Sequence, residues 1–372
     1  MTYSHIPTPA LILDKAKLIA NISRMTNHIK ALGVDLRPHM KTGKSMEVAR
    51  LAMAGNFGGI TVSTLREADY FAAFGVTDIT LAACLAPAKL DRAAALRAAG
   101  IDLKILVDHP RMAQAVAAHA GEHHVLIEID CGEHRTGLLP AAPEIMDIAR
   151  CLDAAPRATL AGVLTHAGHS YQSRQAPEMT AVAETERDAV VGVARQLHDA
   201  GMACPIVSVG STPTATHARD LTGVSEARPG VYMFGDLFQA GIGSCTVDDI
   251  AVSVLATVIA HRRQENVMFI DAGGLALSKD RSTQALANDC AYGLVCQADS
   301  GQPIAGLTVS TVHQEHGQIS ATTALDFDRY PIGSQLRILP NHVCMTAAAY
   351  TEYHVTTAPG QALEIWPRCN GW

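Results

Sequence analysis

The feature of this sequence that most constrains its fold is an alternation, from about residue 11 to residue 235, between short apolar runs and longer amphipathic segments rich in Ala, Leu and charged residues. The short runs are typical of buried strands, and the longer segments are typical of helices. Parallel strands need a crossover long enough for a helix, so the alternation predicts a parallel sheet. We expect strands at residues 11–13, 35–40, 59–63, 78–82, 103–108, 124–130, 160–166, 206–210 and 230–234.

About eight such units favour a closed (β/α)8 barrel. An open doubly wound sheet is the alternative, but no GxGxxG turn opens any unit.

After about residue 245 the pattern changes to β-rich runs that lie close together and are separated by Gly, Pro, Asn and Asp. These runs are residues 252–261, 267–271, 307–313, 335–339 and 353–357. Such spacing predicts a second, mostly antiparallel domain. We therefore expect a barrel at residues 10–245 and a β domain at residues 246–372, which also includes residues 1–9.

Charge and cysteine content exclude several classes of protein. The formal charge is −7, from 29 Lys and Arg against 36 Asp and Glu, with no block of like charges. This argues against nucleic acid or a membrane surface as the partner. The nine cysteines are scattered, and the sequence starts without a basic and then apolar leader. We expect reduced thiols and a cytoplasmic location.

Lys41 is the first candidate for chemistry, because it lies where the second predicted strand ends, in residues 37–42 (RPHMKT). Side chains at the carboxyl ends of barrel strands form the active site in this architecture. A lysine that is shielded there can attack an aldehyde and later act as a base. The alternative is an ordinary surface lysine.

Two later strand ends, residues 208–214 and 228–232, are rich in glycine and hydroxyl side chains. Such loops can bind a phosphate group, and the loops after strands seven and eight are its usual position. With Lys41, they fit an aldehyde cofactor that carries a phosphate, such as pyridoxal phosphate. Other polar residues that follow strands are Arg135, His166, His169 and Tyr171, which could equally be hydrogen-bonded loop residues.

A third candidate lies in the β-rich region, where His342 and Cys344 are two residues apart. If this segment is a strand, both side chains project from the same face and can bind one metal ion. Two protein ligands would leave positions open for substrate. The alternative is a packed histidine and a buried cysteine.

These motifs carry a resemblance to a known family. Residues 38–42 (PHMKT), the 228–230 turn (RPG) and His342-x-Cys344 resemble the fold-type III, alanine racemase-like pyridoxal phosphate enzymes. The chain is similar to the D-serine dehydratase and D-threonine aldolase branch, and most to the zinc-dependent D-threo-3-hydroxyaspartate dehydratases. The resemblance spans the whole length, including residues 207–214, 271–273, 314–317 and 370–372.

The resemblance implies specific roles. Lys41 would carry pyridoxal phosphate, and His342 with Cys344 would hold zinc, or Mn²⁺ or another divalent ion. Arg228 would face the pyridine nitrogen and Arg135 the ring hydroxyl, while Tyr171 and His166 would line the ring or the substrate. The phosphate would be bound by Gly210, Ser211, Thr212, Gly230 and Val231, in loops that also contain Tyr232.

The implied activity is a lyase that dehydrates D-β-hydroxy amino acids to a 2-oxo acid and ammonia. Relatives that cleave the carbon chain often carry His-x-Asp, whereas the softer thiolate of Cys344 favours zinc. Cleavage to glycine and an aldehyde is the alternative, with His166 or His169 as the base. A racemase and a non-catalytic protein of pyridoxal phosphate homeostasis are further options, although single-barrel proteins of that last kind lack the β domain. The resemblance also implies a homodimer that acts on a small molecule.

Overall fold

The computed structural model describes residues 3–357 and 363–372. The chain forms two compact units, which we call the barrel unit and the β unit. The barrel unit is Ser23–Gly230 with Gly371–Trp372, and the β unit is Met1–Ile22 with Val231–Asn370.

Eight parallel strands form the sheet of the barrel unit, in the order β2-β9-β8-β7-β6-β5-β4-β3. Beyond β2, His39 bridges to Thr61 of β3, and the Thr61 N–H donates to the Pro38 carbonyl over 3.0 Å. This bridge joins the two ends of the sheet, so the predicted barrel is confirmed. The strands are β2 (Asp35–Leu36), β3 (Ile60–Val62), β4 (Asp78–Cys84), β5 (Asp102–Val107), β6 (His123–Ile129), β7 (Ala158–Thr165), β8 (Ile206–Val209) and β9 (Glu226–Ala227).

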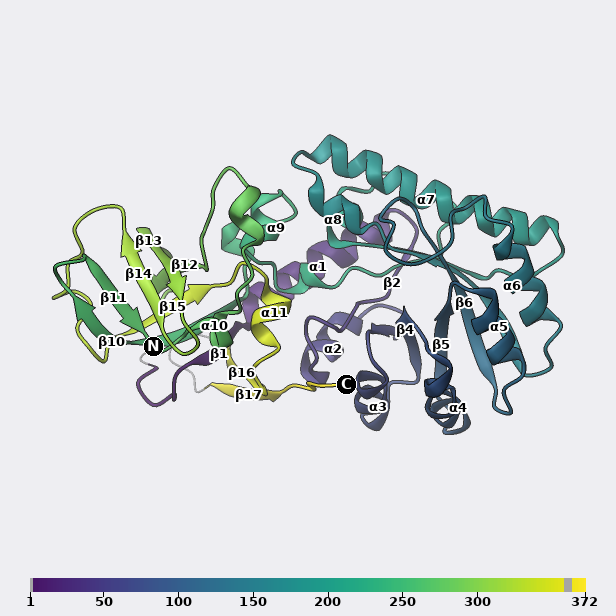
Figure 1. Ribbon diagram of the computed structural model, residues 1–372, viewed down its shortest axis with the longest axis horizontal. Helices are drawn as coiled ribbons and strands as arrows, with labels where there is room; N and C mark the ends of the chain where they lie inside the picture. The colour runs from purple at the N-terminus through teal and green to yellow at the C-terminus, as the bar shows by residue number, and fades with distance from the viewer. Residues whose placement is uncertain (1–2, 358–362) are drawn as a thin grey trace. The chain divides into compact units, whose positions relative to one another are not determined.

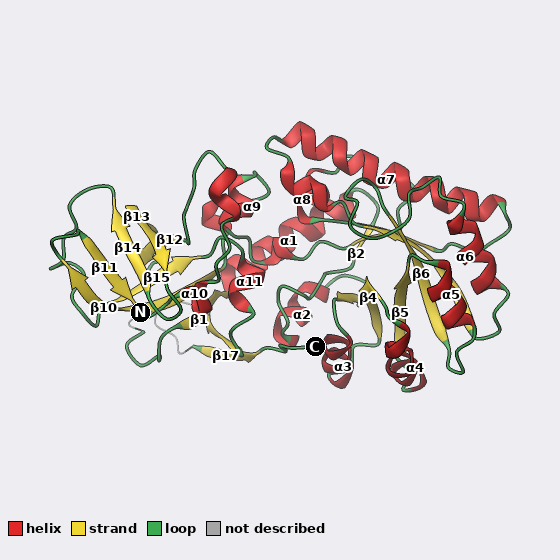
Figure 2. Cartoon of the chain, viewed as in Figure 1, coloured by secondary structure: helices red, strands yellow, loops and turns green. Residues whose placement is uncertain are grey.

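Helices cover the outside of these strands (Figures 1 and 2). Their amphipathic spacing explains this position: α6 buries Ile145, Ile148, Ala149 and Leu152, which recur on one face of the helix. The helices are α1 (Lys15–Ala31), which begins in the β unit, α2 (Met46–Met53), α3 (Leu65–Ala73), α4 (Leu90–Ala98), α5 (Pro110–Ala117), α6 (Glu144–Asp153), α7 (Ala176–Asp199) and α8 (Thr212–His217).

A buried ion network closes the end of the barrel at which the strands begin. Arg37 is 2% exposed, and its guanidinium pairs with Glu226 over 2.7 Å and with Asp78 over 2.8 Å. Lys104 of β5 also pairs with Asp78. Because these charges neutralise one another, this end stabilises the fold and leaves the opposite end for function.

The β unit contains a nine-stranded sheet in the order β11-β14-β13-β12-β15-β10-β1-β16-β17, and β11 also pairs with β10. Among the described residues of this unit, only β1 and β16 pair in parallel, so the mostly antiparallel prediction is confirmed. The strands are β1 (Ala10–Asp14), β10 (Val252–Arg262), β11 (Val267–Ile270), β12 (Leu294–Gln297), β13 (Pro303–Val312), β14 (Gly317–Ala321), β15 (Gln335–Leu339), β16 (Glu352–Thr356) and β17 (Glu364–Pro367). Its other helices are α9 (Leu237–Gly241), α10 (Gly274–Leu277) and α11 (Val343–Ala347).

Three local expectations differ from the structure. The run at 11–13 is a strand, β1, but it pairs with β10 and β16 rather than within the barrel. The strand expected at 230–234 is wrong, because Val231–Met233 forms a 3-10 helix, whose Val231 carbonyl accepts N–H groups from Phe234 and Gly235. A strand through His342 and Cys344 is also wrong, since His342 precedes the first residue of α11.

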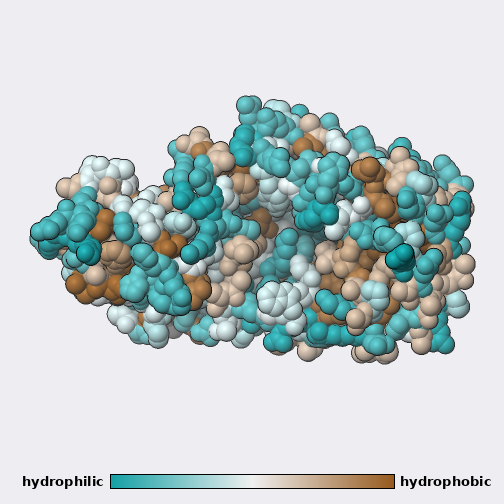
Figure 3. Space-filling view, viewed as in Figure 1, coloured by the Kyte–Doolittle hydropathy of each residue, from teal (hydrophilic) through white to brown (hydrophobic). Residues whose placement is uncertain are grey.

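The surface of the described residues is mixed in character. On the face drawn in Figure 3, hydrophilic residues are spread over each unit between smaller hydrophobic areas. Within the part of the chain that the structure describes, no helix has the length and apolar character that a membrane span requires.

Candidate active site

Lys41 lies in a turn directly after the bridge that closes the barrel, and it is exposed rather than shielded as expected. Its backbone N–H donates to Nδ1 of His39 over 3.3 Å. The turn packs against Gly230, where an added Cβ would lie 2.9 Å from the His39 carbonyl oxygen. The close approach of two loops therefore requires glycine at 230, and it places the predicted lysine beside one of the predicted phosphate loops.

Two buried imidazoles lie close to the Lys41 ammonium. Burial and the charges of Lys41 and Arg228 hold the pKa of His39 well below its usual range. Burial, followed by the Lys41 charge, lowers the pKa of His166 to about 3. The ring of His166 is thus neutral, and its Nδ1 donates to the Gly210 carbonyl over 2.9 Å. This tautomer leaves the lone pair of Nε2 of His166 available to accept a hydrogen bond.

The loop after β8 is organised by buried hydroxyl groups. Ser211 and Thr214 cap each other: the Thr214 N–H donates to the Ser211 hydroxyl, and the Ser211 N–H donates to the Thr214 hydroxyl. Gly210 has φ +138°, and a Cβ there would lie 2.6 Å from the backbone nitrogen of Arg228. Arg228 is 3% exposed and donates to the Ser208 hydroxyl over 2.6 Å. Thr212 is the first residue of α8 in the same loop.

Other predicted residues follow neighbouring strands of the same unit. Arg135 is half-exposed and pairs with Glu133 over 3.3 Å, and its charge contributes to the lowered pKa of His166. His169 and Tyr171 lie in the 3-10 helix Gly168–Gln172 after β7. The buried Nδ1 of His169 has no hydrogen-bond partner among the residues that the structure describes.

This end of the barrel unit fits an anionic, aldehyde-bearing cofactor. Burial, together with the charges of Lys41 and Arg228, keeps the imidazoles of His39 and His166 neutral. A phosphate would complement the positive charges of Lys41, Arg135 and Arg228. The amine of Lys41 and the hydroxyl-rich loop at 210–212 are the groups that pyridoxal phosphate requires. The structure therefore brings together Lys41, Arg135, His166, Gly210 and Arg228. Val231 and Tyr232 belong to the β unit.

The predicted metal ligands meet in the β unit by a route other than a strand. Nδ1 of His342 lies 3.1 Å from Asp280 Oδ2, and the side chains of His342 and Cys344 are hydrogen-bonded. Although burial disfavours the charged imidazole, Asp280, Cys344 and Asp236 raise the pKa of His342 to about 11. A site this negative fits a cation. A carboxylate on Nδ1 also leaves Nε2 of His342 for the ion, as is usual for zinc-binding histidines.

Sequence reasoning missed a further polar cluster at the barrel strand ends. Within residues 3–357 and 363–372, the one group of three potential ligating side chains whose ligand atoms all lie within 4.8 Å of one another is Cys84, Asp108 and Glu128. The Cys84 thiol donates to Glu128 over 2.9 Å, and burial together with both carboxylates raises its pKa. Thr136 also donates to Glu128. Hydrogen bonds thus account for this cluster, in which the thiol is a donor.

Sequence reasoning also missed His39, Asp236 and Asp280. His39 could have been found, because it lies two residues before Lys41 and shares its side of the chain. Asp280 is 62 residues from His342, and no spacing rule connects them.

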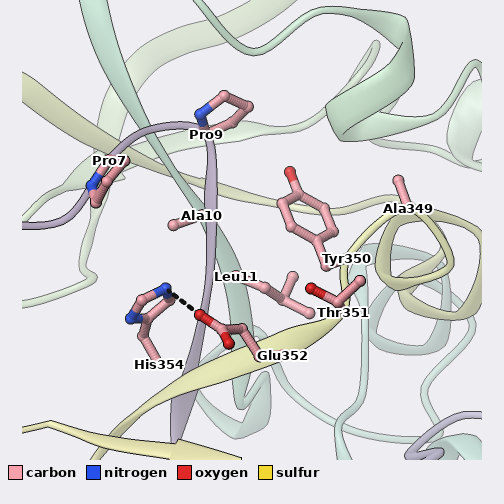
Figure 4. Close-up of a pocket in the computed structure, with 9 residues that line it drawn as sticks. All are labelled: Pro7, Pro9, Ala10, Leu11, Ala349, Tyr350, Thr351, Glu352 and His354. Carbon is pink, nitrogen blue, oxygen red and sulfur yellow. Dashed lines mark ion pairs between the residues drawn. The ribbon is translucent and has the colours of Figure 1, made fainter. Parts of the chain in front are cut away.

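A pocket of about 290 Å³ in the β unit contains none of the predicted site residues. Glu352 and His354 face it from β16 and form an ion pair of 3.5 Å (Figure 4). The other lining residues are Pro7, Pro9, Ala10, Leu11, Ala349, Tyr350 and Thr351.

Comparisons with known proteins decide the family. Residues 13–237 match the alanine racemase N-terminal domain, and residues 251–356 match the putative serine dehydratase domain. The chain belongs to the alanine racemase-like, fold-type III pyridoxal phosphate family. It is similar to D-threo-3-hydroxyaspartate dehydratase of Delftia sp. (strain HT23), with 45% identity over 99% of this chain and 98% of that protein.

Other members of the family resemble the chain along its length. D-serine dehydratase of Dictyostelium discoideum is 30% identical over 99% of this chain and 98% of its own. D-threonine aldolase of Arthrobacter is 26% identical over 98% of this chain and 92% of its own. The solved Delftia dehydratase has a TM-score of 0.96 at 43% identity, covering 99% of each chain. Solved variants of D-threo-3-hydroxyaspartate dehydratase replace a histidine and a cysteine two residues apart, the latter in a metal-free form. Since the named relatives are dehydratases and aldolases, the expectation of a lyase is confirmed.

Proposed function

We propose that this protein is a pyridoxal phosphate- and zinc-dependent dehydratase of D-β-hydroxy amino acids, such as D-threo-3-hydroxyaspartate or D-serine, which it converts to a 2-oxo acid and ammonia. The observation that carries the proposal is that Lys41, an exposed residue in the turn after the bridge that closes the barrel, lies near the buried imidazoles of His39 and His166. The 45% identity to a D-threo-3-hydroxyaspartate dehydratase supports the substrate class.

The cofactor would be held by Lys41 through Nζ, with its phosphate against the loops at 210–212 and 230–232. Arg228 would face the ring nitrogen, and Arg135 the ring hydroxyl. When bound, pyridoxal phosphate supplies an electron sink for the α-carbon of an amino acid. Nζ of Lys41 would then take the α-proton of the substrate, as the general base of the reaction. Tyr171 would line the substrate side.

The metal would be held by His342 and Cys344. Bound zinc supplies a Lewis acid for the β-hydroxyl. Asp280 would orient the His342 ring, and the thiolate of Cys344 favours zinc over Mn²⁺. A histidine and a cysteine at the same spacing are the residues replaced in the solved variants of the related dehydratase, which supports this ligand pair.

Cleavage to glycine and an aldehyde is the second candidate, favoured by the relatives named as aldolases. It needs a base for the β-hydroxyl proton. His166 and His169 are the candidates, since the hydrogen bond from Nδ1 of His166 to the Gly210 carbonyl leaves its Nε2 without a proton, and Nδ1 of His169 is buried without a hydrogen-bond partner among the described residues.

A product assay separates the two reactions. The holoprotein is incubated with D-serine, D-threonine and D-threo-3-hydroxyaspartate, with a chelator and with added zinc, and ammonia, 2-oxo acid and glycine are measured separately. We expect equal amounts of ammonia and 2-oxo acid, loss of both on chelation and recovery with zinc. Glycine as the sole amino product would instead establish the aldolase.

Two lysine variants test the role of Lys41. Lys41→Ala should abolish turnover and the visible absorbance of bound cofactor, whereas Lys89→Ala, at an exposed lysine of the same unit, should preserve both. Full turnover by Lys41→Ala would refute the mechanism.

The proposal includes a homodimer, which the family resemblance supports, and a cytoplasmic location, which the scattered cysteines support. Sedimentation of the holoprotein tests the dimer, and a mass equal to one chain would exclude it.

A further inference from the structure

Glu186 is a buried acid in the barrel unit to which neither the sequence analysis nor the proposed mechanism gives a role. It lies in the middle of α7, is 2% exposed, and reaches inward from a helix that packs on β7 and β8. Burying a carboxylate is costly unless its oxygens are hydrogen-bonded. The hydrogen-bond partners of Glu186 therefore indicate the role of this buried carboxylate.

One oxygen of Glu186 accepts two backbone hydrogen bonds from two different loops. The N–H of Ala167, after β7, and the N–H of Gly210, after β8, both donate to Oε1 over 3.0 Å. Both donors are buried, so without Glu186 each would lack the acceptor that it has in this structure. Because the two amides share one oxygen, the loops cannot separate without breaking a hydrogen bond.

The network continues from Glu186 into the predicted phosphate loop. The Thr214 side chain hydrogen-bonds to Glu186, and the Thr214 hydroxyl lies 2.9 Å from that of Ser211. The Ser211 hydroxyl lies 2.8 Å from that of Ser170, which follows β7. On the other side, the Gly210 carbonyl accepts the hydrogen bond that sets the tautomer of His166. The Ser170–Ser211 and His166–Gly210 hydrogen bonds therefore join the loop after β7 to the loop after β8.

We propose that Glu186 is a positioning residue that holds His166 and the Gly210–Thr212 loop at the spacing needed to bind the phosphate of pyridoxal phosphate. This inference rests on the proposed function. It assigns to Glu186 no contact with cofactor or substrate. Its role is geometric, because the two N–H groups need an acceptor at a fixed position rather than a negative charge.

Two substitutions separate position from charge. Glu186→Gln removes the charge but keeps an oxygen at the same distance from α7, so it can still accept both N–H groups. Glu186→Asp keeps the charge but withdraws the oxygens by about 1.5 Å, the length of one carbon–carbon bond. Val190→Ala is the matched control. Val190 is fully buried one turn further along α7, so its replacement weakens packing but removes no polar contact.

The measurement compares two ligands that differ only in the phosphate. Dissociation constants of pyridoxal phosphate and of pyridoxal are measured by absorbance for the full-length apoprotein and each variant, below the melting temperature of each. In Glu186→Asp we expect the affinity for pyridoxal phosphate to fall about tenfold, with that for pyridoxal unchanged, because two buried donors lose their acceptor geometry. Glu186→Gln and Val190→Ala should retain the wild-type ratio of the two constants within about threefold.

Each other outcome overturns the inference. A wild-type ratio in Glu186→Asp would show that the loops do not depend on Glu186, and an equal fall in Glu186→Gln would show that charge rather than position matters. A wild-type protein that binds neither ligand would refute the proposed function and the inference together, whereas binding by the wild type with an unchanged ratio in the variants refutes only the positioning role.

Discussion

Asp280 illustrates at the scale of one residue how a metal-binding histidine depends on a partner outside its motif. Its carboxylate accepts from Nδ1 of His342 and so orients the ring. The hydrogen bonds from His342 and Ser282 hold the pKa of Asp280 at about 2, although burial opposes them. Asp280 is therefore ionised at neutral pH and ready to stabilise a histidine whose other nitrogen binds a cation.

Asp280→Asn should weaken zinc binding about 10- to 100-fold, because loss of the carboxylate lowers the basicity of His342 and frees its ring. Zinc affinity is measured by competition with a chelating dye. Asp328→Asn is the control, since Asp328 is a highly exposed acid of the same unit whose side chain pairs with Arg263. Equal zinc affinities of the two variants would contradict the role of Asp280.

His123 should make the stability of the protein depend on pH. It is 1% exposed, and burial, with the charges of His119 and Arg97, lowers its pKa to about 4 from an ordinary value of 6.5. The unfolded chain therefore binds more protons than the folded chain as the pH falls below 6.5. The contribution of His123 to the free energy of unfolding is complete above that pH and is lost as the pH falls toward 4.

Urea unfolding at pH 7, 6, 5 and 4 measures this effect. Relative to wild type, His123→Gln should reduce the loss of stability over this range, by at most about 1.4 kcal/mol per pH unit. The exposed His198→Gln variant serves as control. Parallel curves for wild type and His123→Gln would disprove the assignment.

At the scale of an element, β7 depends on a glycine that no side chain can replace. Gly162 has φ +144°, and a Cβ there would lie 2.0 Å from the Ile206 carbonyl oxygen of β8. The pairing of β6 with β7 shifts register nearby, between Val125 and Leu126. Gly162 therefore permits a local irregularity that lets β7 pair with both neighbours.

Gly162→Ala should lower the free energy of unfolding by about 3 kcal/mol through backbone strain and steric overlap. Gly192→Ala, in α7, should instead raise it by up to about 1 kcal/mol, because an added Cβ there contacts nothing within 4 Å and alanine favours the helix. Urea unfolding of both variants gives the comparison. An unchanged stability of Gly162→Ala would show that β7 is not constrained in this way.

At the scale of the whole molecule, the β unit is formed by two separate stretches of the chain, Met1–Ile22 and Val231–Asn370, and most of the barrel unit lies between them in the sequence. β1 lies between β10 and β16, and its Leu11, Ile12 and Leu13 are fully buried. The N-terminal strand is therefore an interior strand of a sheet whose other members come from beyond residue 250.

Deletion of residues 1–14 should unfold the β unit, because the loss of three buried aliphatic side chains exceeds the stability margin of most domains. Hydrogen exchange should then become fast in β10 and β16 and stay slow in β5 to β7 of the barrel unit. Deletion of Gly371–Trp372, where Trp372 is 94% exposed, should leave exchange in the β unit unchanged. Slow exchange in β10 after the N-terminal deletion would contradict the central role of β1.

Periodicity alone predicted much of this molecule, because the alternation of strands and helices is a local property of the chain. It located the barrel strands β2 to β8 within a few residues but missed β9, and the closely spaced β-rich runs after residue 245 indicated the antiparallel unit. Lys41, Gly210 and Arg228 could be found as candidates because the ends of barrel strands share one end of the sheet. The motifs around Lys41 and His342 also carried the family resemblance, which the matches along the chain confirm.

Only the tertiary structure decided which segments pair and which groups meet. The same apolar character suits a barrel strand and an interior strand of the other unit, so β1 could not be assigned locally. The 3-10 helix at Val231–Met233 and the helix at Val343–Ala347 interrupt runs that periodicity reads as strands. Glu186 and Asp280 gain their roles from partners far along the chain. The sequence by itself determined the classes of element and the reactive residue types; long-range hydrogen bonds and burial, which no local pattern encodes, decided their partners and their protonation.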